Sequence, residues 1–229
     1  MRCDLIIKGK YILAMDNKLT VIKDGFVAVS AGKIIVVGAE TEIKNYQAEE
    51  IIDAGNSIIM PGLINNHTHA AMAYFRGLAD DLPFAVWLNE HIWPAEAKYV
   101  NEEFVAKSGE LSCLEMIKSG TTCFNDMYFF GQNIMAETAA RAGLRALIGI
   151  DLKNPEMSIK YAIDLAGQYK GNEYIEITLA PHSVYACSAD TLKKVSQAAK
   201  ANNFRIHIHV SESEKEITEA EGKNRTQKA

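Results

Sequence analysis

The chain has 229 residues, of which 48% are hydrophobic, and its formal net charge at pH 7 is −5. This length allows one large domain of alternating strands and helices, or one such domain with a small accessory piece, and the apolar content suffices for a buried core. The negative charge, without any run of five or more basic residues, argues against nucleic acid and anionic membranes as partners.

The four cysteines, Cys3, Cys113, Cys123 and Cys187, are scattered and form no C-x-x-C pair. This usage is typical of reduced thiols in a cytosolic protein. The apolar run at the N-terminus is broken by Lys8, and no stretch approaches the roughly 20 apolar residues of a membrane span. We therefore expect a soluble, cytoplasmic protein.

Short β-type runs dominate residues 4–53, at 5–7, 11–13, 26–29 and 34–38. Residues 30–33 form a turn between the last two runs, and only residues 41–47 favour a helix. This part of the chain contains no cluster of catalytic residue types. We predict a small antiparallel β-sandwich and assign residues 1–56 to it.

From residue 57 onward, strand-like segments alternate with helical periodicity. The expected strands cover 58–64, 121–125, 145–150, 174–180 and 205–210, and the expected helices 101–119, 134–142, 159–168 and 192–201. Asn101 and Ser188 are candidate N-caps, and glycines follow three of the helices. In the first helix, one face carries apolar residues: Phe104, Leu111, Leu114 and Ile117.

Repeating β-α units imply a parallel sheet with right-handed crossovers. Two architectures fit, an open doubly wound sheet and a (β/α)8 TIM barrel. No G-x-G-x-x-G follows the first strand, which disfavours a dinucleotide-binding sheet. We predict that residues 57–229 form about the first five units of a (β/α)8 barrel.

His67 and His69 stand at the C-terminal end of the first predicted barrel strand. Side chains two residues apart point to the same side of a strand, so both imidazoles can reach one divalent metal. In barrels the active site lies at this end of the strands. The alternative is a pair of polar loop histidines, but the preceding strand and Pro-Gly-Leu-Ile-Asn-Asn favour metal ligation.

His209 ends the fifth predicted strand, which faces the first across an eight-stranded barrel. It can therefore complete a site begun by His67 and His69, and three nitrogens with an open water position make a catalytic zinc site. Glu212 follows three residues later, within reach of the same water. His207 and His209 are otherwise ordinary strand histidines, and for His207 we prefer that interpretation.

Residues 60–100, MPGLINNHTHAAMAYFRGLADDLPFAVWLNEHIWPAEAKYV, resemble the first barrel segment of the methylthioadenosine/S-adenosylhomocysteine deaminases of the amidohydrolase superfamily. The resemblance extends from about residue 4 to about residue 222 and is most specific at 67–98 and 207–216. It implies a barrel of the metal-dependent hydrolase type and hydrolytic deamination of an adenosine-type nucleoside with release of ammonia. The N-terminal β region resembles half of a composite sandwich.

The resemblance also implies roles for individual residues. His67, His69 and His209 would bind one divalent metal ion, Zn2+ or alternatively Fe2+, since imidazoles suit both. Glu212 would act as general acid/base, moving a proton from water to the ring nitrogen, and would contact the substrate.

Two further residues match substrate-binding positions of the family. Glu96 would hold the ribose hydroxyls, where its alternative is a solvated acid at a helix start. His182, after the fourth strand, would contact substrate, where its alternative is a structural histidine. Glu96 lies in the long connection at residues 70–100, which is typical of a lid or binding loop, and His182 lies at the rim of the predicted barrel. We expect Trp87 and Trp93 in this connection to be packing residues.

Some features assign no chemistry or depart from the family. Asp126 and Asp151 are acids at the rim of the predicted barrel without an assigned role. Some family members carry a substrate-binding arginine near the end of the third strand, where this sequence has Gly149-Ile150-Asp151. Arg145 lies too early to replace it, which leaves the exact substrate open.

The resemblance places a further histidine on a sixth strand and an aspartate on an eighth, beyond the five strands found here. The last residues, 219–229, are typical of a polar helix end or tail, and from Lys223 they no longer follow the family. We expect a truncated or frame-disrupted product with unpaired sheet edges and little or no deaminase activity on its own. The complete family member is expected to be a homo-oligomer.

Two other functions stay open at this point. One is a different amidohydrolase activity, such as that of a guanine deaminase or a chlorotriazine-type hydrolase. The other is a non-enzymatic fragment that acts by association. Glu96 and the segment Trp-Leu-Asn-Glu-His-Ile-Trp-Pro favour the nucleoside deaminase.

Overall fold

The structure of the chain is a computed structural model that describes residues 1–214 and 216–218. The chain forms two compact units, Met1–Gly62 and Leu63–Ala229, and each is described by itself. The tail expected at residues 219–229 lies outside the described residues. Within the described part, no helix is long and apolar enough to cross a membrane.

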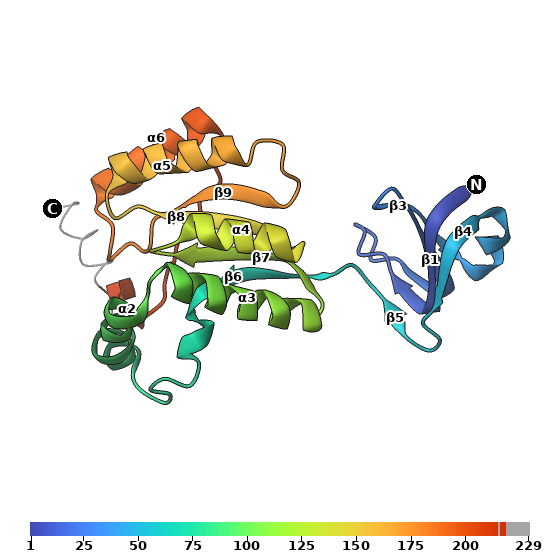
Figure 1. The fold of residues 1–229 in the computed structure, drawn as a ribbon, viewed down its shortest axis with the longest axis horizontal. Coiled ribbons are helices and arrows are strands. Elements are labelled where there is room, and N and C mark those ends of the chain that lie inside the picture. Colours follow the sequence, from blue (N-terminus) through green and yellow to red (C-terminus); the bar gives the residue numbers. More distant parts are fainter. Residues whose placement is uncertain (215, 219–229) are drawn as a thin grey trace. The chain divides into compact units, whose positions relative to one another are not determined.

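The first unit is one five-stranded sheet in which β5 pairs with β1 beside the order β3-β2-β1-β4 (Figure 1). Its elements are β1 (Arg2–Leu13), β2 (Val21–Ser30), β3 (Lys33–Ala39), the 3-10 helix η1 (Glu40–Asn45), β4 (Gln47–Asp53) and β5 (Ile58–Ile59). The prediction of a purely antiparallel unit is wrong, because β1 is antiparallel to β2 but parallel to β4 and β5. The crossover through η1 returns the chain in the direction of β1 and so makes the sheet mixed.

The second unit is built on a parallel sheet in the order β6-β7-β8-β9. Its strands are β6 (Leu63–Thr68), β7 (Thr121–Tyr128), β8 (Arg145–Asp151) and β9 (Ile175–Ala180). Its long helices are α3 (Glu102–Lys118), α4 (Gln132–Ala142), α5 (Pro155–Gln168) and α6 (Ala189–Asn202). Helices follow successive strands and pack along the sheet (Figure 1), which confirms the predicted partial barrel of β/α units.

The core of this unit lies between the strands and these helices. Alternate strand residues are buried there, as the period of two requires, and small or apolar helix residues pack on them. The strand residues include Phe124, Ile148, Ile150, Ile177 and Leu179, and the helix residues include Met135, Ala139, Leu165 and Val195. This layer holds the strand ends, where the functional side chains stand, in fixed register.

The helix ends agree with the sequence. The Asn101 side chain accepts the N–H of Phe104 at 2.9 Å, and Ser188 caps α6 in the same way. The predicted apolar face of α3 is wrong, since Leu114 and Ile117 are 55% and 49% exposed. The buried face carries mostly small residues instead: Val105, Ser108, Gly109, Ser112, Cys113 and Met116.

Close packing explains this choice of small residues. A Cβ added at Gly109 would lie 2.9 Å from the sulfur of Met135 in α4. The 3-10 helix η2 (Ala70–Phe75) also packs on α3, where Ser108 and Ser112 bond its backbone. Hydrophobic periodicity therefore does not predict the buried face of α3, because hydrogen bonds to η2 and close contact with α4 determine which face is buried.

Two of the predicted strands are not continuous strands in the structure, and in each case a proline lies within the segment or in its pairing partner. Residues 58–64 form two strands, β5 in the first unit and β6 in the second, with Pro61 between them. Residues 205–210 make only isolated bridges, Leu179 with Ile206 and Ser183 with His209. Leu179 exchanges backbone hydrogen bonds with this segment, but Pro181 has no N–H with which to continue the ladder.

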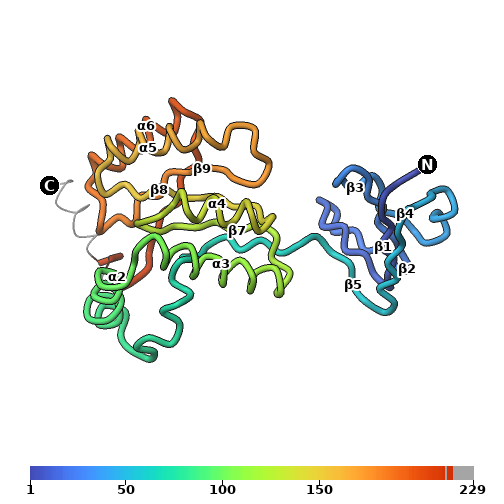
Figure 2. Tube along the Cα trace, viewed as in Figure 1, coloured from blue at the N-terminus to red at the C-terminus, as the bar shows by residue number. Residues whose placement is uncertain are grey.

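Residues 70–100, the predicted lid or binding loop, are largely helical. The chain runs from the end of β6 through this segment and back along α3 (Figure 2). Beyond η2 the segment contains α1 (Phe84–Val86), the π-helical turn η3 (Trp87–Ile92) and α2 (Trp93–Tyr99). Its side chains form part of the wall of the site described next.

Candidate metal centre

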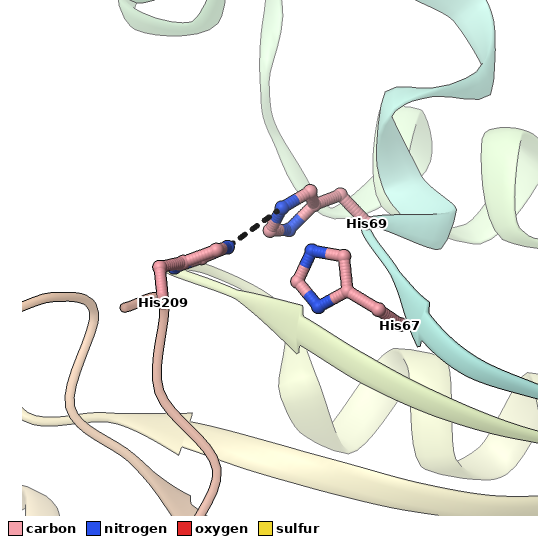
Figure 3. A group of neighbouring side chains, drawn as sticks. All are labelled: His67, His69 and His209. Carbon is pink, nitrogen blue, oxygen red and sulfur yellow. Dashed lines mark hydrogen bonds between the residues drawn. The ribbon is translucent and has the colours of Figure 1, made fainter. Parts of the chain in front are cut away.

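Three histidines that are far apart in sequence meet beyond the ends of the parallel strands. His67 lies in β6, His69 directly follows it, and His209 comes from the segment beside β9. Their ligand nitrogens all lie within 4.8 Å of one another, and the rings converge (Figure 3). Among the described residues, these three form a group that could hold a metal ion.

Backbone carbonyls fix the orientation of two of these rings. Nδ1 of His69 donates to the carbonyl of Met127, and Nδ1 of His209 donates to the carbonyl of His182 at 2.6 Å. Because a carbonyl only accepts, the proton of each neutral ring is on Nδ1 and the lone pair is on Nε2. Both lone pairs therefore point into the shared space.

The spacing of these lone pairs suits a metal ion. The two Nε2 atoms are 3.3 Å apart, the contact drawn as a dashed line in Figure 3. A tetrahedral ion with metal–nitrogen bonds of about 2.0–2.1 Å places two ligand nitrogens about 3.3 Å apart. A cation between them would also relieve the repulsion of two facing lone pairs. The donor set thus fits a divalent metal ion.

Burial keeps the imidazoles in the form that binds metals. It lowers the pKa of His69 to about 4, and it is also the main cause that lowers the pKa of His67. Neutral imidazole is the ligand form, so these rings need lose no proton at neutral pH. Three imidazole nitrogens around one ion would leave a fourth tetrahedral position for water or substrate.

A cavity of about 660 Å³ opens beside the histidines. Its walls come from residues 70–100, from the ends of β7 and β8, and from the segments after β9. The lining includes five residues singled out from the sequence: His69, Glu96, His182, His209 and Glu212. Large apolar side chains contribute most of the rest, including Trp87 and Trp93, so both tryptophans face this space.

Glu212 lies at the wall of the cavity and is held by two neighbours. Its carboxylate accepts the Tyr185 hydroxyl at 2.7 Å. Its backbone N–H donates to the Glu216 carboxylate at 2.8 Å, and so does that of Ser211 at 3.2 Å. Ser211 has a φ of 58°, a left-handed conformation that these bonds help to hold.

Glu216 and Tyr185 were not singled out from the sequence. Glu216 is only 5% exposed, although an acid in a polar C-terminal stretch would ordinarily be solvated. Its position four residues after Glu212 is the available signal, since one helical turn brings its carboxylate back to the preceding backbone. Tyr185 gives no sequence signal that distinguishes it.

His182 contributes to the site through its backbone and its ring. Its carbonyl holds His209, and its ring centroid is 4.7 Å from that of His209. Its Nδ1 lies 3.2 Å from the Ser183 hydroxyl, and burial lowers the pKa of the ring. The half-buried imidazole lines the cavity, as the substrate-contacting interpretation requires.

Glu96 extends from α2 into the cavity wall and is only 8% exposed. Burial raises the pKa of this carboxyl, and the nearby Tyr128 hydroxyl opposes that rise, although this hydroxyl makes no hydrogen bond to any described residue. Tyr128 is itself buried and lines the same cavity. Sequence reasoning missed it, because an apolar strand end gives no sign of which helix it will face.

The remaining residues discussed from the sequence fall into different places. Asp151 lines the cavity, and burial raises the pKa of its carboxyl. Asp126 is 2% exposed and accepts the N–H of Ala70. His207 is partly buried and packs where Gly149 has no side chain, and its Nε2 has no hydrogen-bond partner in the part of the chain that the structure describes.

A parallel β/α sheet of barrel type, with imidazoles and a cavity at the carboxyl ends of its strands, defines the class of metal-dependent hydrolases. Within that class, residues 58–228 match the profile of the amidohydrolase family, and the chain belongs to this family.

Two curated relatives match almost the whole chain. A 5-methylthioadenosine/S-adenosylhomocysteine deaminase of Thermodesulfovibrio yellowstonii is 47% identical to this chain, and the match covers 93% of this chain and 51% of that protein. A 5'-deoxyadenosine deaminase of Methanococcoides burtonii is 42% identical to this chain, and the match covers 94% of this chain and 50% of that protein. The chain thus spans about half the length of these relatives.

A solved structure shares the fold. The adenosine deaminase from Xanthomonas campestris with bound zinc superposes with a TM-score of 0.91 at 33% sequence identity. The match covers 96% of this chain and 52% of that one.

Proposed function

We propose that this site is the metal centre of a hydrolytic deaminase that acts on adenosine-type nucleosides, such as 5-methylthioadenosine or S-adenosylhomocysteine, and releases ammonia. The observation that carries the proposal is the convergence of His67, His69 and His209 beside the cavity that Glu96 and Glu212 line. The named activities of the relatives and the zinc in the related structure support it.

In this proposal the three imidazoles bind one divalent ion, Zn2+, although the same nitrogens also suit Fe2+. When bound, such an ion makes water reactive near neutral pH. Glu212 takes a proton from the attacking water and delivers it to the ring nitrogen of the purine. The Tyr185 hydroxyl and Glu216 hold Glu212 in place for this transfer.

Glu96 and His182 bind the substrate. A buried carboxylate needs polar partners, and Glu96 is 8% exposed in the wall of the cavity. The two vicinal hydroxyls of a ribose can supply them. The apolar walls, which include Trp87 and Met72, suit a purine ring and a thioether substituent.

Binding is the direct test, since the chain spans about half the length of its relatives. The Zn2+-loaded 229-residue chain is titrated calorimetrically with 5-methylthioadenosine, 5'-deoxyadenosine and guanine. We expect the two nucleosides to bind and guanine, which has no ribose, to bind much more weakly. Guanine binding as tight as that of the nucleosides would overturn the proposed substrate class.

A matched pair of variants locates the nucleoside. Glu96→Gln keeps the shape but removes the charge, and a hydrogen bond to a charged group contributes about 1.5–3 kcal/mol, so we expect affinity to fall at least tenfold. Glu90→Gln, an exposed acid of the same segment, serves as the control. Equal nucleoside affinities of these two variants would contradict the role of Glu96.

A further inference from the structure

The peptide groups on either side of Ala70 are held from two elements of the second unit. The carboxylate of Asp126, in β7, accepts the Ala70 N–H at 2.7 Å. The Ser112 hydroxyl, in α3, donates to the Ala70 carbonyl at 2.6 Å. Ala70 begins η2 and directly follows His69, so both bonds act on the backbone next to a ring of the histidine cluster.

The same part of β7 also holds the His69 ring. Nδ1 of His69 donates to the carbonyl of Met127, the residue after Asp126. Residues 126 and 127 therefore hold the backbone that follows His69 and the side chain of His69 together. Two adjacent points of attachment leave the imidazole little freedom to rotate.

The support itself is rigid. At Asp126, β7 is paired on both sides, with Thr68 of β6 and with Ile148 of β8. Asp126 is 2% exposed and Ser112 is 7% exposed. Burying a carboxylate is costly unless its bonds compensate, so a well-packed apolar residue would be the cheaper choice at position 126.

We propose that Asp126, together with Ser112, is a positioning residue for the metal ligand His69, and that its burial serves the geometry of the metal centre. This inference rests on the proposed metal centre. Asp126 acts through the Ala70 peptide and touches neither metal nor substrate. Outer-shell partners of metal ligands commonly affect metal affinity by about 10- to 100-fold.

The test uses Co2+ as the metal probe on the purified 229-residue chain, because its visible absorption reports ligand geometry as well as occupancy. Asp126→Ala should weaken Co2+ binding about 10- to 100-fold and change the spectrum. Asp126→Asn retains an oxygen that can accept the Ala70 N–H, so it should restore most of the affinity. Ser112→Ala should weaken binding in the same direction.

Ser108→Ala is the matched control. Ser108 is also a buried serine of α3, but its hydroxyl accepts the N–H of Tyr74, four residues further from His69. We expect it to leave Co2+ affinity and spectrum unchanged. Thermal unfolding of each metal-free variant is measured in parallel. If Asp126→Ala does not fold, the comparison of Co2+ binding between Ser112→Ala and Ser108→Ala tests the positioning role.

The outcomes separate the two proposals. If the unmodified chain binds no Co2+, the metal centre itself fails, and the role of Asp126 fails with it. If the unmodified chain binds Co2+ and the Asp126 and Ser112 variants bind it equally well with the same spectrum, only the positioning role is overturned. Equal losses in Ser112→Ala and Ser108→Ala would also overturn it.

Discussion

Gly149, in the middle of β8, offers a test of how tightly the interior below the histidines is packed. A Cβ at this position would lie 2.5 Å from Nε2 of His207 and 2.6 Å from the Cβ of Ala180. Both distances are well below ordinary van der Waals contact. Gly149→Ala therefore requires the His207 ring and the β9 end at Ala180 to move away from β8.

The expected loss of stability follows from the two clashes. Overpacking a core by a methyl group costs about 1–3 kcal/mol. Two separate clashes place Gly149→Ala toward the upper end, about 2–3 kcal/mol. This exceeds the stabilisation of about 0.4–1 kcal/mol that alanine gains from a less flexible unfolded chain. The variant should be clearly destabilised.

His207→Ala removes one of the two clashing groups, so the cost of Gly149→Ala should fall to about 1 kcal/mol in that background. Both tryptophans of the chain, Trp87 and Trp93, belong to the second unit, so their fluorescence during urea unfolding reports this unit. An equal cost of Gly149→Ala in the two backgrounds, or no cost in either, would refute the packing argument.

Three further predictions concern the site. Replacing His67, His69 or His209 by alanine should lower Zn2+ affinity more than about 100-fold, because losing a metal ligand costs more than losing a residue that only orients the ligand. Elemental analysis of the bound Zn2+ after dialysis checks this, with His91→Ala as the control. Undiminished Zn2+ in any of the three variants would contradict the ligand set. Tyr128→Phe should raise the pKa of Glu96 further, since the nearby hydroxyl opposes its rise. Nucleoside binding should then weaken by up to about tenfold, because a carboxyl that is protonated more readily accepts hydrogen bonds less well. Unchanged affinity in calorimetry would count against this role of Tyr128. Burial raises the pKa of Asp126 to about 7, above its value in the unfolded chain, so its contribution to stability is complete at low pH and is lost as pH rises through 7. The free energy of unfolding of metal-free Asp126→Asn, relative to that of the unmodified chain, should therefore increase from pH 5 to pH 8. A decrease over that range would contradict the raised pKa of Asp126.

Local sequence signals predicted the elements that lie within one segment. Strands β7, β8 and β9 and the long helices follow from periodicity, and the caps at Asn101 and Ser188 follow from the chemistry of their side chains. The H-x-H motif also predicted that two imidazoles share one side of a strand end. The structure brings His209 to them because the segment after α6 returns beside β9.

The predictions from the sequence are wrong where a residue distant in the chain, or a proline without an N–H, determines the local structure. Pro61 divides one apolar run between two sheets, and Pro181 interrupts the pairing of the fifth strand. The face of α3 is chosen by close contacts and serine hydrogen bonds. Neither Tyr128 beside Glu96 nor Asp126 below Ala70 could be predicted, since each pair is brought together only by the tertiary fold.

The rings of His69 and His209 are both anchored by main-chain oxygens, those of Met127 and His182. Every amino acid supplies such an oxygen, so the side chain at position 127 can vary without releasing His69. Met127 lines the cavity and is 3% exposed, so substitutions of similar volume at this position can change the shape of the cavity while the carbonyl still holds the His69 ring. The shape of the cavity and the orientation of the His69 ring therefore depend on different atoms of the same residue.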